Sequence, residues 1–374
     1  MNMRKWRNKF IICFMIVFVF LSGIFYINRK SIGYVLDYLY FIRVVETNSF
    51  RLNTIPTLDT KQIYLNKIMN CKNDREFLND LIEFYFNYET KGHFNIVDVD
   101  SYHRIHQVYK NLIQDKRISK NNWNYKKLMD KEVFDSYSKL GKDTPCLHEE
   151  NDRGVDCYED GEFFVIEFHS FDISMLNSLA QINEELQDFH GDKIIIDISD
   201  NEGGSDIVWK KLVSYLSGAD YRYKSKITGH GKASKKYVES YGIDVQGSES
   251  KFSYIDCIDV QGSESKFSYI DCIDIQSEKL FDFKKVYLIM GDKTFSAADS
   301  FARFSKSTGF ATVIGKESAG FGTGLDPMLL KLPYTNVLVM LDSVGKYPET
   351  TKPTYQLNNI WIKDVEQYIV TNNI

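Results

Sequence analysis

The sequence has 374 residues, of which 43% are hydrophobic and 14% aromatic, so it is long enough to form two domains with sizeable cores. The formal net charge of −5 is small for this length and gives no reason to expect nucleic acid as a partner. The cysteine spacings match no zinc-binding pattern and no nucleotide-binding motif is present, so we expect neither a metal nor a cofactor.

The first thirty residues differ in character from the rest of the chain. Residues 10–27 form an uncharged apolar run between basic residues, and a helix of this length can span a bilayer. The leading basic residues favour an amino terminus inside the cell. Because no convincing cleavage site follows, we expect residues 1–30 to be an uncleaved membrane anchor, with a cleaved signal peptide as the alternative. Both interpretations place the following residues outside the cytoplasm.

Residues 31–142 are predicted to form an all-helical N-terminal domain, because apolar residues recur there at helical spacing. The predicted helical segments are 31–52, 59–90 and 98–118. A polar, loop-like segment follows. Within it, Cys146 and Cys157 could close a short loop through a disulfide, although free thiols fit equally well.

Residues 143–374 are predicted to form an α/β domain. Strands are predicted at 163–168, 193–198, 285–290 and 310–314, helices at 174–189, 205–217 and 296–307, and a hairpin at 325–332 and 335–342. Alternation of strands and helices is typical of a layered α/β domain.

A tandem repeat at 243–272 interrupts this domain. Residues 243–257 recur identically as 258–272, and residues 273–276 begin a third copy. A solenoid needs at least three units. Two identical copies therefore favour an insertion in a surface loop, with a substrate-facing role as the alternative.

Two turns between a strand and a helix carry the residues best suited to catalysis. Ser296 follows an apolar strand and precedes an amphipathic helix, whose first amides can stabilise an oxyanion. Gly203 and Gly204 lie in a second turn of the same kind. A hydroxyl in one turn and exposed glycine amides in the other predict an acyl-transfer site.

The segments around these turns resemble the S41 serine peptidases, the group of tail-specific proteases and the tricorn core. Residues 194–205 resemble the family's IIDLRxNxGG segment, 294–299 its TxSAxE segment, and 311–315 its ATxxG strand. The resemblance extends over about residues 160–355. It implies a ClpP/crotonase-like α/β core without a PDZ module, because residues 94–160 are too few for one.

The resemblance also implies the roles of individual residues. Ser296 would be the nucleophile, and the backbone amides of Ala297 and of Gly203 or Gly204 would form the oxyanion hole. Ser199 stands where the family has an arginine.

A serine hydroxyl needs a general base. The lysine that serves one branch of the family falls at Phe321 here, so a serine–lysine dyad is not expected. His93 resembles the histidine of the family's DGHT motif and is the expected base, with His169 or no catalytic histidine as alternatives. Glu349 loosely resembles a family glutamate and is expected to orient His93, while Asp299 is expected to be structural.

The sequence therefore predicts an exported, membrane-tethered serine endopeptidase that cleaves a polypeptide substrate through an acyl-enzyme. The lipid bilayer would be a partner through residues 10–27, and nucleic acid would not be a partner. One alternative is a non-catalytic binding protein with the S41 fold, since a fold alone does not secure an activity. Another is an esterase or amidase that uses the same chemistry.

Overall fold

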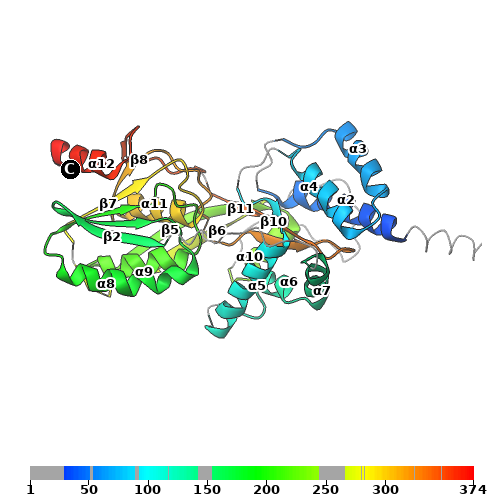
Figure 1. Ribbon diagram of the computed structural model, residues 1–374, viewed down its shortest axis with the longest axis horizontal. Coiled ribbons are helices and arrows are strands. Elements are labelled where there is room, and N and C mark those ends of the chain that lie inside the picture. The colour runs from blue at the N-terminus through cyan, green and yellow to red at the C-terminus, as the bar shows by residue number, and fades with distance from the viewer. Residues whose placement is uncertain are drawn as a thin grey trace, which may run out of the picture. The chain divides into compact units, whose positions relative to one another are not determined.

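The computed structural model describes residues 29–50, 54–88, 92–116, 118–141, 154–243, 266–278, 280–281, 283–323, 325–346 and 348–374. The chain divides into two compact units (Figure 1). The N-terminal unit is Met1–Leu147 with Pro327–Asp342, and the C-terminal unit is His148–Asp326 with Ser343–Ile374. The predicted anchor at 10–27 lies outside the described residues, and none of the helices that are described is both long and apolar enough to cross a membrane.

The N-terminal unit is mostly helical. Its helices are α2 (Arg29–Asn48), α3 (Leu58–Met69), α4 (Asp74–Tyr85), α5 (Val99–Gln114), α6 (Trp123–Leu128) and α7 (Lys131–Leu140). Side-chain caps begin several of them. At α5, for example, Asp98 accepts a hydrogen bond from the amide of Ser101 at 2.8 Å. Aromatic rings fill much of the interior, where Tyr34 stacks on Phe77 with the ring centroids 4.9 Å apart.

This unit is not all-helical, because it also contains a three-stranded sheet. Strand β1 (Asn95–Ile96) pairs antiparallel with β10 (Leu338–Leu341), which pairs antiparallel with β9 (Met328–Lys331). The local pattern assigns the β9–β10 hairpin to the C-terminal domain, but Leu329 and Leu338 are buried in one cluster with Tyr102 and Tyr137 of the helices. The hairpin therefore belongs to the N-terminal unit, although it is far along the chain from the helices that cover its apolar face.

The C-terminal unit is built on a six-stranded sheet with the order β12-β8-β7-β4-β3-β2. The strands are β2 (Val155–Asp160), β3 (Phe163–Phe168), β4 (Lys193–Asp197), β7 (Lys285–Met290), β8 (Thr312–Gly315) and β12 (Tyr355–Gln356). Strand β2 pairs antiparallel with β3, and the other neighbouring pairs are parallel.

Helices cover both faces of this sheet (Figure 1). The 3₁₀ helix η2 (Ile173–Leu176) and helices α8 (Ser178–Asp188), α9 (Asp206–Leu216) and α11 (Ala297–Thr308) pack on one face, and α12 (Ile362–Asn372) packs on the other. Side chains alternate accordingly: Ile194 and Ile196 are buried under the first group, and Ile195 is buried under α12. The predicted layered α/β core behind a helical N-terminal region is confirmed.

A second sheet in this unit contains part of the repeat. Strand β11 (Val344–Gly345) pairs antiparallel with β5 (Tyr221–His230), which pairs with β6 (Lys266–Ile275) along its whole length; α10 (Lys232–Glu239) follows β5. Residues 266–272 end the second copy of the repeat, so the prediction of a loop insertion is wrong for them. Residues 244–265 lie outside the described residues.

The described cysteines, Cys71, Cys157 and Cys272, are free thiols, and Cys146 lies outside the described residues. The thiol of Cys157 donates to Glu185 at 2.9 Å. Burial and this carboxylate raise the pKa of Cys157 to about 12, which makes it an unreactive thiol.

Candidate active site

Ser296 occupies the turn between β7 and α11, directly before the first helical residue, Ala297. Its backbone has φ 53° and ψ −119°, a region that residues with a side chain rarely adopt and that costs about 1–3 kcal/mol. The amide of Ser296 donates to the carbonyl of Gly320 at 2.8 Å, and its carbonyl accepts from the amide of Ser300 at 2.9 Å. A serine fixed in a strained turn at a helix start matches the arrangement of a nucleophile elbow.

The turn of Gly203 and Gly204 lies directly beside this serine. A Cβ added to Gly203 would be 2.7 Å from the Cβ of Ser296 and 3.1 Å from the amide nitrogen of Ala297. A Cβ added to Gly204 would be 2.3 Å from the backbone of Phe171. Both glycines have positive φ, 103° and 135°, so conformation and space both require glycine here. The structure thus brings the two predicted turns together.

The backbone amides of these turns differ in what they bind. The amide of Gly203 donates to the side-chain oxygen of Asn201 at 2.8 Å. Within the described parts of the chain, the amides of Gly204 and Ala297 have no acceptor. Ala297 is the first residue of α11, so its N–H is one of the donors that a helix leaves unpaired. Of the two glycines predicted for the oxyanion hole, Gly204 is therefore the one with an available donor.

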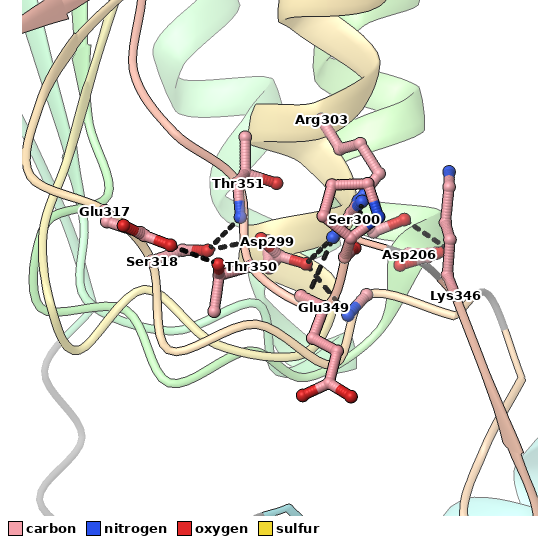
Figure 2. Close-up of polar contacts among 12 residues, drawn as sticks. Asp206, Asp299, Ser300, Arg303, Glu317, Ser318, Lys346, Glu349, Thr350 and Thr351 are labelled. Carbon is pink, nitrogen blue, oxygen red and sulfur yellow. Dashed lines mark hydrogen bonds and ion pairs between the residues drawn. The ribbon is translucent and has the colours of Figure 1, made fainter.

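Asp299, in the first turn of α11, is completely buried and binds the loop that supports Ser296. Its carboxylate accepts from the hydroxyl of Ser318 at 2.6 Å, from the amide of Gly322 at 3.0 Å and from the guanidinium of Arg303 at 3.1 Å (Figure 2). Gly320, whose carbonyl binds the amide of Ser296, lies between the first two donors in sequence. Asp299 therefore stabilises the turn that contains Ser296.

Glu349 belongs to the same network through its backbone. Arg303 donates to the carbonyl of Pro348 at 2.8 Å and to the carbonyl of Glu349 at 3.1 Å. Figure 2 shows the Glu349 carboxylate pointing away from Asp299 and Arg303. The side chain that was expected to orient a histidine is exposed and lies in the C-terminal unit.

His93 lies in the N-terminal unit, where it pairs with Asp342. Its Nδ1 is 2.8 Å from one oxygen of that carboxylate, and its backbone amide donates to the other oxygen at 2.8 Å. The pairing of Asn95 with Met340 in β1 and β10 continues to this position, so Asp342 lies opposite His93. Because Nδ1 faces the carboxylate, Nε2 is the ring nitrogen suited to exchange a proton.

Sequence reasoning missed Asp342, which is 249 residues from His93 along the chain. The available signals were the short extended run after His93 and the hairpin that ends before Asp342. Nothing local indicates that these two segments pair.

His169, the alternative base, directly follows β3 and lies between two carboxylates. Its Nδ1 is 3.2 Å from both oxygens of Asp200, and its Nε2 is 3.5 Å from Asp156. Since both ring nitrogens face carboxylates, neither is suited to take a proton from a serine, and His93 is the better candidate. Among the residues with described positions, no group of three or more His, Cys, Asp or Glu side chains could hold a metal ion.

The position of the family's catalytic lysine holds an aromatic residue. Phe321 is buried, and its ring centroid is 5.4 Å from that of Phe295, which precedes the nucleophile. A different lysine, Lys346, has its Nζ 2.5 Å from the hydroxyl of Tyr223. Burial and the nearby Arg303 lower the pKa of Lys346 to about 8. The contact that the structure gives for the ammonium group of Lys346 is therefore with Tyr223 of β5, not with Ser296.

Comparison with known proteins gives the family and the fold of the chain. The model of peptidase family S41 matches residues 163–347, which include both turns and Asp342. The structure is similar to a lipoprotein from Streptococcus agalactiae, at 14% identity over 91% of this chain and 96% of that chain, with a TM-score of 0.51. It also matches a putative peptidase from Parabacteroides merdae, at 15% identity over 91% and 92% with a TM-score of 0.48, and the tricorn protease, at 12% identity over 57% and 18% with a TM-score of 0.34. At 14% identity the likeness to the lipoprotein shows the fold alone. A search of curated proteins finds no matching sequence.

Proposed function

Residues 163–347 are a peptidase family S41 domain, and from this premise we propose that the protein is a serine endopeptidase that cleaves polypeptides through an acyl-enzyme. The observation that carries the proposal is the close approach of Gly203 to Ser296 and Ala297. It sets a strained serine beside two amides that have no acceptor among the described residues. A serine with a purely structural role would need neither a strained backbone nor amides without acceptors beside it.

In this proposal the hydroxyl oxygen of Ser296 attacks the scissile carbonyl carbon while His93 takes the hydroxyl proton. The amides of Gly204 and Ala297 stabilise the oxyanion, each contributing about 3–4 kcal/mol by analogy with measured oxyanion-hole donors. His93 then gives the proton to the leaving amine as the carbon–nitrogen bond breaks. Water attacks the resulting ester, releases the new carboxyl terminus and restores the serine.

We assign the orientation of His93 to Asp342 in place of Glu349. Two hydrogen bonds of 2.8 Å join Asp342 to the ring and to the backbone of His93, which fixes the ring orientation and favours the tautomer with a proton on Nδ1. The carboxylate would also stabilise the imidazolium that forms when Nε2 takes a proton.

The location of the enzyme rests on the sequence. The apolar run at 10–27, with basic residues on both sides, supports a single membrane anchor and a catalytic domain outside the cytoplasm. If the leader is cleaved, the same domain would be secreted.

The test uses the purified full chain in detergent with casein, an unfolded protein substrate, and reads the products by mass spectrometry. We expect fragments from the wild type and from His169→Ala, and none from Ser296→Ala or His93→Ala. Cleavage that persists in Ser296→Ala would refute the proposal. Intact casein in every sample would favour the non-catalytic binding protein, and turnover of esters without peptides would favour an esterase.

A further inference from the structure

Asn201 lies in the turn between β4 and α9 and is completely buried. Its side-chain nitrogen donates to the carbonyl of Phe168 at 2.9 Å, and its side-chain oxygen accepts from the amide of Gly203 at 2.8 Å. Its backbone carbonyl accepts from the amide of Phe295 at 3.1 Å. One residue therefore joins the end of β3, the glycine turn and the residue directly before Ser296.

Two further hydrogen bonds support the glycine turn, and both involve Phe171. The amide of Phe171 donates to the carbonyl of Gly203 at 2.8 Å, and the amide of Ser205 donates to the carbonyl of Phe171 at 2.7 Å. Neither of these bonds engages the amide of Gly203. Two consecutive glycines impose little steric restraint on their peptide planes. The bond from Phe171 therefore fixes the peptide that carries the amide of Gly204, and the side chain of Asn201 fixes the preceding peptide, which carries the amide of Gly203.

We propose that Asn201 is the positioning residue of the oxyanion hole: by accepting the amide of Gly203 and donating to the carbonyl of Phe168, it withdraws that donor from the reaction, anchors the glycine turn to the end of β3 and leaves Gly204 and Ala297 as the pair that binds the oxyanion. Its backbone bond to Phe295 keeps this pair in register with the nucleophile. Asn201 touches no reacting atom and acts through the glycine turn. The inference rests on the proposed serine-peptidase function.

The experiment compares the full-length wild type with Asn201→Ala on a peptide that the wild type cleaves. A fluorophosphonate probe counts reactive Ser296 sites, so that kcat is expressed per competent site. We expect kcat to fall by about 10²–10³-fold, the loss found when one oxyanion-hole donor is removed, while KM changes by less than about threefold. The Ki of a peptide aldehyde with the same sequence should rise in proportion to the fall in kcat. The Ki of the product peptide, which forms no oxyanion, should stay unchanged.

Two further variants separate positioning from general stability. Asn201→Asp keeps an oxygen that can accept the amide of Gly203, so we expect at least about tenfold higher kcat than in Asn201→Ala. Asn124, in the N-terminal unit, is also buried and bonds to the hydroxyl of Tyr109, the carbonyl of Pro327 and the amide of Leu329. Asn124→Ala should lower the melting temperature and leave kcat per competent site unchanged.

The outcomes are distinguishable. Asn201→Ala with normal kcat per site, or with the aldehyde and the product peptide weakened equally, would overturn the inference. If Asn201→Ala does not fold, Asn201→Leu, which fills the same space but cannot accept the amide of Gly203, replaces it, and a folded Asn201→Leu with an unaltered kcat per site and an unaltered aldehyde Ki would overturn the inference as well. A wild type that cleaves nothing refutes the proposed function itself, and the inference falls with it before any variant is measured.

Discussion

Replacing Asp342 by asparagine tests which carboxylate orients His93. The nearer oxygen of Asp342 is 2.8 Å from Nδ1 of His93. At this separation, Coulomb's law with an effective dielectric constant of about 20 gives about 6 kcal/mol between the carboxylate and the imidazolium that forms when the ring takes a proton. Each factor of ten in rate corresponds to about 1.4 kcal/mol. Because the two side chains remain 20% and 11% exposed and water screens part of this energy, we expect kcat to fall by about 10³–10⁴-fold.

The amide introduced by Asp342→Asn has the same shape as the carboxylate and could still accept the backbone amide of His93, so the fold should be retained. Its NH₂ group cannot accept the proton on Nδ1, which leaves the ring in the wrong tautomer for catalysis. The assay is kcat/KM of the full chain on one cleaved peptide, with circular dichroism as a check on folding. The matched variant is Glu349→Gln, which we expect to retain activity within about threefold, since a solvent-exposed substitution away from the reacting groups has small effects. The assignment would be refuted if Asp342→Asn kept more than about a tenth of wild-type activity. It would also be refuted if Glu349→Gln lost more activity than Asp342→Asn.

Three further predictions concern stability. Ser296→Gly should melt about 2–4 °C above Ser296→Ala, because glycine relieves about 1 kcal/mol of strain at φ 53°; equal melting temperatures would exclude that strain. Burial raises the pKa of Asp197 to about 6, so its ionisation penalises the folded state above that pH and has no effect below the unfolded value near 4. Asp197→Asn should therefore stabilise the protein by up to about 3 kcal/mol at pH 8 and by nothing at pH 4, as measured by urea unfolding at the two pH values. Deleting residues 243–257 should preserve β6 and raise stability by about 0.8 kcal/mol, because the connection between α10 and β6 shortens from 26 to 11 residues; a loss of cooperative unfolding would contradict this.

The two turns of the candidate site could be predicted because their signals are local. An apolar strand, a turn with glycine or serine, and an amphipathic helix occupy consecutive residues around both Gly203 and Ser296. Parallel strands β4 and β7 are neighbours in the sheet, so their following turns meet at one edge. Short-range pattern and this simple topology were enough to bring the turns together.

Asp342 could not be predicted in the same way, because its partner is chosen by a strand pairing between distant segments. The pairing of β1 with β10 involves only two residues on the β1 side, too few for a period-two pattern to be recognised. The hairpin that carries Asp342 is directed to the N-terminal unit by burial of Leu329 and Leu338 against Tyr102 and Tyr137. Its own sequence reads equally well as part of the α/β domain.

The repeat limits prediction in a different way. Because its two copies are identical, the sequence of the repeat does not indicate which copy pairs with β5. Residues 251–260 match the ten residues of β6 at every position except the last, so both copies carry the same alternation of polar and apolar residue types. What distinguishes them is the chain that follows. Ser277 and Glu278 follow β6 closely. The amide of Glu278 donates to the carbonyl of Ser214 in α9 at 2.8 Å, and the amide of Ser277 donates to Asp220, in the connection from α9 to β5, at 2.8 Å. Pairing the first copy with β5 would place a long connection between the strand and these anchors and add loop entropy on that side. Connectivity to α9, more than any property of the strand itself, therefore selects the second copy.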